Sequence, residues 1–262
     1  MDWTKEAKEA RKQYIGGSDA AAILGISRYK TPLQVWAIKT GEIVPPDIDD
    51  VVAVKLGKKL EQTVAEFFED ATGKKLARVN NTIYHPDYPF LAANIDRRVI
   101  GEEAGFEAKT TNQFKQSEWE KEEIPVEYLI QCIHCMAVTG WPVWYIAVLI
   151  GNQKFLWKKI ERQNKVIDDL VKKEVAFWNN FVVPKIMPMQ ITSEDSSILY
   201  VLFPHAAEES VIELGDDASK ICESLDSMKA DYNVLEKEID AQENTLKAML
   251  KTYETGVTPI IK

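Results

Sequence analysis

A short stretch near the middle of the chain holds two carboxylates and an amine at a spacing that could do chemistry. Asp96 directly follows the mostly apolar run 90–95. Glu107, which begins the triplet Glu107-Ala108-Lys109, comes eleven residues after Asp96. Glycines at 101 and 105 mark a turn between them, so the pattern predicts an antiparallel hairpin that brings the three charged groups to one end of a sheet. Side chains alternate along a strand, which places Glu107 and Lys109 on the same face.

These groups have the chemistry of a metal-assisted hydrolase. Two carboxylates and the main-chain carbonyl of Ala108 form an all-oxygen donor set, which suits magnesium. A lysine beside such a cation can stabilise the charged transition state of phosphodiester cleavage. The residues therefore indicate a metal-dependent phosphodiesterase, with a solvated hairpin that carries charges on its outer face as the alternative interpretation.

Two helices are expected on either side of this hairpin in the sequence. Apolar residues recur at helical spacing over 60–71, with Glu61 at the start of that helix. The segment 125–140 reads as a largely buried helix closed by a glycine, and Tyr128 and Gln131 are three residues apart on one of its faces. The apolar runs 143–150 and 154–160 then predict a second hairpin whose first strand is central.

The order of these groups resembles a known family. The residues that carry the resemblance are Arg11, Gly16-Gly17-Ser18-Asp19, Glu61, Asp96, Glu107-Ala108-Lys109 and Tyr128-x-x-Gln131. This constellation is similar to that of the YqaJ-type viral recombinases, which include the exonuclease of phage lambda and belong to the PD-(D/E)XK nuclease superfamily. The resemblance spans roughly residues 10–185. It implies an α/β (α+β) restriction-endonuclease-like core, with a central mixed β-sheet flanked by helices.

The resemblance also implies a role for each matching residue. Asp96, Glu107 and the Ala108 carbonyl would be metal ligands, with help from Glu61. Lys109 would be the catalytic lysine, and Gln131 would border the active site with Tyr128 beside it. Arg11 and Ser18 would bind a DNA 5′-phosphate. One departure is visible, because Asn94-Ile95 precedes Asp96 where the superfamily has its eponymous proline.

The activity implied by this resemblance is that of a phage or prophage enzyme acting in the bacterial host cytoplasm. It would be a Mg²⁺-dependent deoxyribonuclease, with Mn²⁺ as a substitute, that digests double-stranded DNA in the 5′→3′ direction. The product would be a 3′ single-stranded tail for a phage single-strand annealing protein, and the enzyme would assemble as a homotrimer. Two other functions stay open: a structure-specific DNA endonuclease on the same fold, and a catalytically silent DNA-binding scaffold protein.

Each of the flanking residues also has a purely structural interpretation. Ser18 is a good N-cap for the alanine-rich helix that follows it, although a helix start behind two glycines is equally a ready anion site. Arg11 could be a surface residue of a first helix over 3–14, and Glu61 could complement a helix dipole. Gln131 could be a satisfied core amide and Tyr128 a packing residue.

The composition is that of an intracellular globular protein. The chain has 262 residues, of which 45% are hydrophobic, enough for one α/β domain with an appendage. No apolar run approaches the roughly 18 residues of a membrane span, and the N-terminus has no signal-peptide pattern, so a cytoplasmic protein is expected.

Three cysteines are too few for a disulfide framework or for a four-cysteine iron–sulfur cluster. Cys132-x-x-Cys135 with His134 between them would suit zinc, but no second pair follows, so core cysteines are expected and a zinc site is not.

The last third of the sequence is a separate acidic segment. Residues 186–262 hold 6 Lys or Arg and 15 Asp or Glu out of totals of 32 and 41, so residues 1–185 carry 26 of each and are neutral. Prolines 184 and 188 stop the preceding helix, which predicts a nuclease domain over 1–185 and a helical extension over 186–262. Apolar residues repeat at alternating steps of four and three between Ile221 and Met249. This heptad seam would pack either on the chain's own domain or on a partner.

Overall fold

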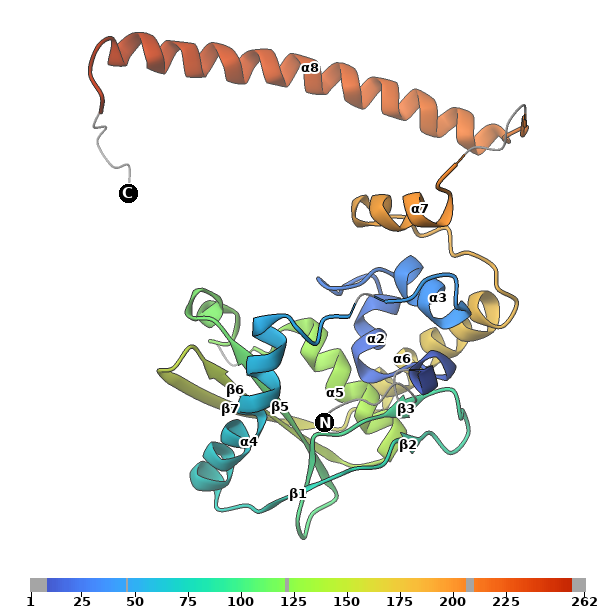
Figure 1. Ribbon diagram of the computed structural model, residues 1–262, viewed down its shortest axis with the longest axis vertical. Coiled ribbons are helices and arrows are strands. Elements are labelled where there is room, and N and C mark those ends of the chain that lie inside the picture. The colour runs from blue at the N-terminus through green and yellow to red at the C-terminus, as the bar shows by residue number, and fades with distance from the viewer. Residues whose placement is uncertain (1–8, 46, 121–122, 206–209, 256–262) are drawn as a thin grey trace. The chain divides into compact units, whose positions relative to one another are not determined.

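The structure is a computed structural model that describes residues 9–45, 47–120, 123–205 and 210–255 (Figure 1). The chain divides into two compact units, Met1–Pro204 and His205–Lys262. The first unit contains the sheet and the second contains one long helix. Within the described ranges, none of the helices combines the length and the apolar composition that a membrane crossing requires.

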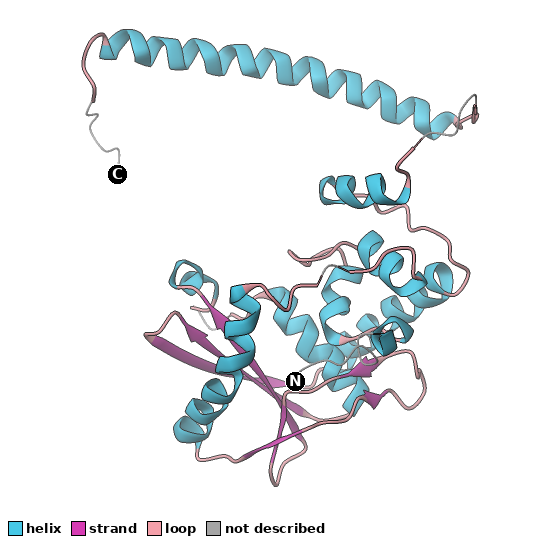
Figure 2. Cartoon of the chain, in the orientation of Figure 1, coloured by secondary structure: helices cyan, strands magenta, loops and turns pink. Residues whose placement is uncertain are grey.

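A mixed five-stranded sheet forms the centre of the first unit (Figure 2). Its strand order is β1 (Leu76–Arg78), β4 (Arg97–Val99), β5 (Ala104–Thr111), β6 (Val143–Ile150) and β7 (Lys154–Glu161). The pair β5–β6 is parallel and the other three pairs are antiparallel. The short strands β2 (Ile83–Tyr84) and β3 (Ala92–Ala93) form a separate ladder. The expected mixed sheet is therefore confirmed, as are both hairpins, β4–β5 and β6–β7, the latter with its second strand at the sheet edge.

Helices cover both faces of this sheet because its interior strand β6 is apolar on both sides. In β6, Trp144, Ile146 and Val148 pack into one core cluster, whereas Tyr145 and Ala147 pack into another. The first cluster is shared with the helices α2 (Gly17–Ile23), α3 (Pro32–Thr40), α5 (Val126–Thr139) and α6 (Asn164–Phe177). The second is covered by α4 (Val52–Thr72) through Val64 and Phe68. Such a two-sided burial is the usual environment of a strand in a parallel pair.

Two glycines permit close approaches that build this core. A Cβ on Gly17 would stand 3.2 Å from the Gln131 carbonyl oxygen and 3.3 Å from the Cys135 sulfur, so its absence lets α2 pack directly on α5. A Cβ on Gly105 would stand 2.3 Å from the Trp144 ring, which occupies that space instead. Both contacts fix elements that carry the groups described below.

A buried ion pair ties α5 to α6. His134 and Glu174 have no exposed surface, and His134 Nδ1 lies 2.7 Å from Glu174 Oε1 while its Nε2 lies 3.1 Å from the Ala92 carbonyl oxygen in β3. Burial lowers the pKa of His134, but the Glu174 carboxylate and the two hydrogen bonds outweigh it and raise that pKa above its ordinary value. A protonated imidazole is the form that donates to both acceptors.

The element boundaries differ from the predicted ones in three places. Helix α4 begins at Val52 rather than near residue 60, and the helix expected to run to residue 183 becomes a π-helical turn, η3 (Trp178–Val182), after α6. Residues 3–8 of the expected first helix lie outside the described residues, and the part that follows contains the 3₁₀ turn η1 (Arg11–Gln13). These boundaries depend on packing that no local pattern encodes.

Residues 186–204 pack on the nuclease core and belong to the first unit. They contain the 3₁₀ turn η4 (Ser193–Asp195) and the helix α7 (Ser196–Leu202), and Ile198 is buried in the main core cluster. Asp195 is fully buried and accepts a hydrogen bond from the Thr31 hydroxyl at the start of α3. The contact-based division thus falls after Pro204, whereas the boundary after residue 185 stays a prediction about where the nuclease domain ends.

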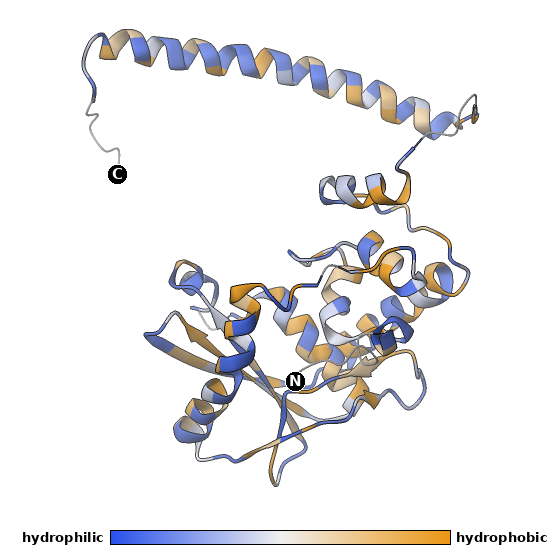
Figure 3. Ribbon diagram, in the orientation of Figure 1, coloured by the Kyte–Doolittle hydropathy of each residue, from blue (hydrophilic) through white to orange (hydrophobic). Residues whose placement is uncertain are grey.

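The second unit is dominated by α8 (Asp216–Leu250), a helix of 35 residues with no buried residue. Figure 3 shows hydrophobic and hydrophilic residues interleaved along its whole length.

The buried ion pair generates a stability prediction. We expect Glu174→Gln to lower the free energy of unfolding by about 3–5 kcal/mol, because it leaves a buried charge without its partner. The pKa of His134 is raised in the folded state. The stability that the ion pair contributes is therefore complete below 6.5, the pKa of histidine in the unfolded chain, and is lost as the pH rises through the folded-state pKa. The difference between wild type and variant should therefore be largest near pH 6 and shrink toward pH 9 in urea unfolding.

The matched control is Asp169→Asn on the same helix, where a surface pair with Lys172 contributes at most about 1 kcal/mol. A difference for Glu174→Gln that grows with pH would contradict the protonated state of His134.

Candidate active site

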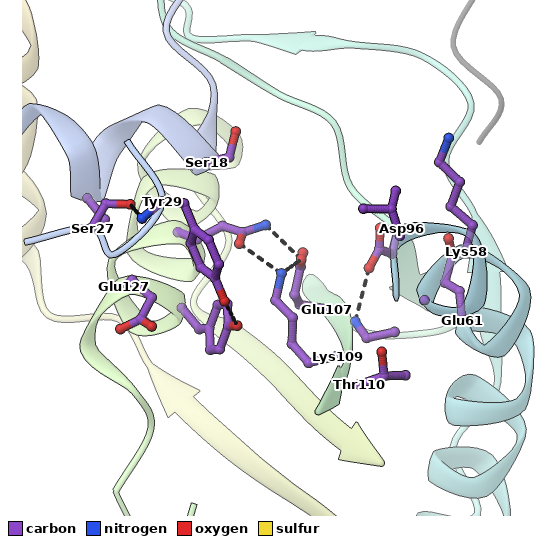
Figure 4. Close-up of a pocket in the computed structure, with 16 residues that line it drawn as sticks. Ser18, Ser27, Tyr29, Lys58, Glu61, Asp96, Glu107, Lys109, Thr110 and Glu127 are labelled. Carbon is purple, nitrogen blue, oxygen red and sulfur yellow. Dashed lines mark hydrogen bonds and ion pairs between the residues drawn. The ribbon is translucent and has the colours of Figure 1, made fainter. Parts of the chain in front are cut away.

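The hairpin carboxylates and lysine meet in a cavity of about 470 Å³ between β5, α4 and α5. Figure 4 shows Glu107 and Lys109 pointing toward each other, with Tyr29 on one side and Asp96, Glu61 and Lys58 on the other. The alternation of β5 produces this arrangement, since Phe106 and Ala108 pack toward α4 while Glu107 and Lys109 project toward α5.

Asp96 stands immediately before β4 and is fixed from the neighbouring strand. Its Oδ2 accepts a hydrogen bond of 3.0 Å from the Ala108 amide. Burial, and then the negative charge of Glu107, raise the pKa of Asp96 from its ordinary value to about 8. Two carboxylates therefore share a site that holds too little positive charge for both of them.

Lys109 is part of a closed triangle of polar contacts. Its Nζ lies 2.6 Å from Glu107 Oε1 and 2.9 Å from Gln131 Oε1, and Gln131 Nε2 donates to the same Glu107 oxygen at 2.7 Å. Although burial lowers the pKa of Lys109, the Glu107 carboxylate raises it further, so the net shift is upward. The lysine is thus held as a cation, and Gln131 fixes the orientation of both partners.

Tyr128 forms one wall of the cavity and contacts the lysine. The Lys109 ammonium lies 4.8 Å from the centre of the Tyr128 ring, a cation–π distance. The ring also stacks on Trp119, and its hydroxyl lies 3.0 Å from that of Tyr29. Tyr128 therefore packs against Trp119 and also contacts Lys109, so a packing role and a place at the border of the site are compatible.

Glu61 faces the same cavity from α4, but its carboxylate contacts Arg97. Its Oε1 lies 3.3 Å from Arg97 Nη2, and Arg97 is itself almost fully buried. The negative charge of Glu61 contributes to the raised pKa of Asp96. The structure thus places Glu61 at the rim of the Asp96 site with a cation already beside it.

Arg11 and Ser18 lie together in an adjoining cavity of about 320 Å³, which also reaches Lys58, Glu61 and Asp96. Arg11 Nη2 donates to Ser18 Oγ at 2.9 Å. Ser18 is not the N-cap of α2, which corrects that interpretation, because the cap is Gly16 and the Asp19 carboxylate accepts from the Gly16 amide at 3.2 Å. The Ser18 hydroxyl is therefore exposed at the cavity instead of closing the helix end.

A buried charge cluster under Arg11 and Ser18 escaped the sequence analysis. Asp19 pairs with Lys39 at 2.7 Å and with Lys30, and Lys39 Nζ also donates to the Arg11 carbonyl oxygen at 2.7 Å. Burial raises the pKa of Asp19, but Lys39, Lys30 and Arg11 hold it well below its usual value. The cluster ties α2, α3 and the Arg11 backbone together. The only local signal was an acid directly after Gly16-Gly17-Ser18.

The residues around Asp96 fit a hard divalent cation. The donors available are the carboxylates of Asp96 and Glu107 and the Ala108 carbonyl, all oxygen, and the raised pKa of Asp96 marks negative charge that a cation would neutralise. Among the described residues, no three His, Cys, Asp or Glu side chains already converge as a preformed cluster. Such a cation would be held by Asp96, Glu107 and the Ala108 carbonyl, with Glu61 lining the same cavity and the rest of its shell from solvent or substrate.

The cysteines of α5 belong to the core. Cys132 and Cys135 are buried in the main cluster, and burial raises the pKa of both thiols above the ordinary value. Thiols in this state are poor metal ligands because the thiolate is the binding form.

The chain is similar to known proteins in sequence and in structure. The model of the YqaJ-like viral recombinase domain matches residues 6–142. The protein YqaJ of Bacillus subtilis (strain 168) is 37% identical over 250 residues, which cover 94% of this chain and 78% of that protein.

Among solved structures, the crystal structure of an alkaline exonuclease, LHK-Exo, from Laribacter hongkongensis superposes with a TM-score of 0.60 at 19% identity. The match covers 70% of this chain and 94% of that one. A second structure of LHK-Exo, in complex with dAMP, matches equally well. At this identity the structural match shows a shared fold.

The charge cluster beneath the second cavity generates a prediction. We expect Asp19→Asn to lower the free energy of unfolding by about 3–5 kcal/mol, because Lys39 would keep a buried charge without its counterion. The pKa of Asp19 is depressed in the folded state, so the loss should be complete at neutral pH and fade as the pH falls below the ordinary aspartate range. Urea unfolding at pH 7 and at several pH values below 3.8 measures both effects.

Asp50→Asn is the matched control, because the Asp50 side chain of the Asp50–Lys55 pair is 99% exposed and solvent screens the contact, so its loss should have little effect on stability. Equal effects of the two variants would show that the Asp19 cluster does not support the fold.

Proposed function

This chain belongs to the YqaJ-like viral recombinase family, and on that premise we propose that it is a metal-dependent deoxyribonuclease with Asp96, Glu107 and Lys109 at its active centre. The observation that carries the proposal is the convergence of these three groups in one cavity, with Gln131 bonded to two of them. A solvated hairpin would leave the charges apart and exposed, whereas Glu107 is buried here.

The residues divide the chemical work between them. A divalent cation, Mg²⁺ or Mn²⁺, held by Asp96, Glu107 and the Ala108 carbonyl would supply Lewis acidity and charge neutralisation. Lys109 is kept protonated by its neighbours, so it serves as a donor that orients the attacking water or a phosphate oxygen and stabilises developing negative charge. Gln131 and Tyr128 are positioning residues, because they contact the lysine and set its direction.

The second cavity supports a preference for DNA ends. Arg11 and Ser18 line the same cavity as Asp96, so a strand with its terminal phosphate on Arg11 and Ser18 would lie within reach of the catalytic carboxylates. An Arg fork and a hydroxyl are suitable donors for a terminal phosphate dianion. We therefore assign Arg11 and Ser18 to a 5′-phosphate and infer 5′→3′ digestion of double-stranded DNA.

This assignment fits what is known of similar proteins. LHK-Exo, which shares the fold, is described as an alkaline exonuclease and has been crystallised with dAMP, a nucleoside monophosphate. The product of the proposed reaction is a 3′ single-stranded tail, the substrate that a phage annealing protein would take up. A homotrimer that encloses the duplex stays our proposal for the nuclease domain.

The catalytic role of Lys109 can be tested directly. We expect Lys109→Ala to lower nucleotide release from linear duplex DNA by at least about a hundredfold in Mg²⁺ or Mn²⁺, because it removes a charge that acts on the transition state. The variant should keep the fold, measured by its circular dichroism. Lys165→Ala, an exposed lysine of α6, is the control and should retain full activity. Full activity in Lys109→Ala would refute the mechanism.

The same assay separates the candidate functions when a covalently closed circular duplex is digested in parallel. An exonuclease degrades the linear form alone, an endonuclease also cuts the circle, and a silent binding protein degrades neither.

The end-binding role of Arg11 makes a separate prediction. We expect Arg11→Ala to lower the initial digestion rate about tenfold to hundredfold on 5′-phosphorylated ends, since a charge-assisted contact contributes roughly 1.5–3 kcal/mol. The rate on 5′-hydroxyl ends should change little, so that the two substrates become alike. Lys12→Ala, one residue along the same turn, is the control. If the wild-type enzyme digests both ends at the same rate, Arg11 and Ser18 do not read the phosphate.

A further inference from the structure

The long helix of the second unit carries an apolar face with no cover in the structure. None of the residues of α8 is buried, and the exposed fraction of the large apolar side chains between Ile221 and Met249 runs from 45% at Leu225 to 71% at Met249. Most of the stability of a helix in water comes from packing an apolar face, so such a seam requires a partner surface.

The spacing of the seam is that of a two-stranded coiled coil. Taking Leu225 as position a, the a positions continue with Tyr232, Ile239 and Leu246. The d positions are then Met228, Leu235, Gln242 and Met249. Eight successive core positions follow the heptad without a break, and the residues at positions e and g beside them set the orientation of the partner.

Charge disfavours a parallel pairing of two copies of this helix. In a parallel dimer each g residue faces the e residue of the next heptad in the other chain. Asp231 would then face Glu236, and Glu238 would face Glu243. Each contact occurs twice by symmetry, which makes four like-charge contacts and no attractive one.

An antiparallel pairing replaces part of this repulsion with attraction and gives the polar core residue a partner. When Ile239 packs against Leu235 of the second copy, Lys229 faces Glu243 of the second copy twice, once on each side of the two-fold axis. In the same register Gln242, the polar residue of the seam, packs against Tyr232 of the second copy, whose hydroxyl can bond to the amide. Glu243 also pairs with Lys247 of its own helix at 3.2 Å, an exposed contact of small value.

We propose that α8 is a self-association element that forms an antiparallel two-stranded coiled coil with α8 of a second copy of this chain. Its outer layers pair Leu225 with Met249 and Met228 with Leu246, and its inner layers pair Tyr232 with Gln242 and Leu235 with Ile239. Glu236 and Glu238 each meet their own counterpart near the two-fold axis, which weakens the dimer, so neutralisation of these two groups should tighten it.

Cysteine cross-linking of the full-length chain tests the orientation. In a Cys222→Ser background, Leu225→Cys combined with Met249→Cys should form a disulfide-linked dimer under mild oxidation, whereas either single variant should not. Ala230→Cys combined with Asn244→Cys is the matched control, because both lie at outward f positions and should not cross-link. This readout concerns α8 alone and is independent of any assembly of the first unit and of the proposed nuclease activity.

Charge reversal tests the affinity. Lys229→Glu should weaken dimerisation by about tenfold in sedimentation equilibrium, because two attractive contacts become repulsive. Adding Glu243→Lys should restore it. In a parallel dimer Lys229 would face Ser224, so neither change would follow this pattern.

Three outcomes would overturn the proposal. Cross-linking of the single Leu225→Cys variant would show a parallel dimer. Failure of the double variant to cross-link at tens of micromolar protein would show that the chain's own first unit, or another protein, covers the seam. If adding Glu243→Lys to the Lys229→Glu variant does not restore the affinity, the proposed register is wrong.

Discussion

The crowding of two carboxylates at one end of the sheet is the constraint on which the rest of the first unit depends. Asp96 immediately precedes β4 and Glu107 lies in the neighbouring strand β5, and burial together with the charge of Glu107 raises the pKa of Asp96 to about 8. Protonation of Asp96 or compensating positive charge relieves such a cost. Lys109 supplies part of it, but its shortest contacts are with Glu107 and Gln131. The remainder is what a divalent cation would provide, so the energetics of folding and the proposed catalysis make the same demand on this site.

The surrounding elements hold that strained site in place. Gln131 reaches Glu107 and Lys109 from α5, and α5 is itself held by the close approach of α2 at Gly17 and by the buried His134–Glu174 pair. On the adjacent side, the Asp19 cluster fixes the backbone of Arg11. Charged groups thus lie in two layers: an inner layer that supports helices, and an outer layer whose groups face the cavities and are available to a substrate.

Local periodicity was enough to predict the centre of the site. The alternation of a strand put Glu107 and Lys109 on one face, and the i, i+3 spacing of a helix put Tyr128 beside Gln131. The contacts that join distant segments were not predictable in this way. The Asp19–Lys39 and Glu61–Arg97 pairs depend on how helices pack, and the capping role that was the alternative interpretation of Ser18 belongs to Gly16 and Asp19. Similarly, nothing local indicated that residues 186–204 pack on the main core through Ile198.

The most direct test of the central claim is a crystal structure of the full chain with Mn²⁺, with anomalous scattering used to locate the ion. The account predicts an anomalous peak bonded to the carboxylates of Asp96 and Glu107 and to the Ala108 carbonyl oxygen, at about 2.0–2.2 Å as for hard cations of this size. The peak should disappear in Asp96→Asn crystals grown in the same conditions. A peak at Cys132 and Cys135, or no peak near Asp96 at millimolar Mn²⁺, would contradict it.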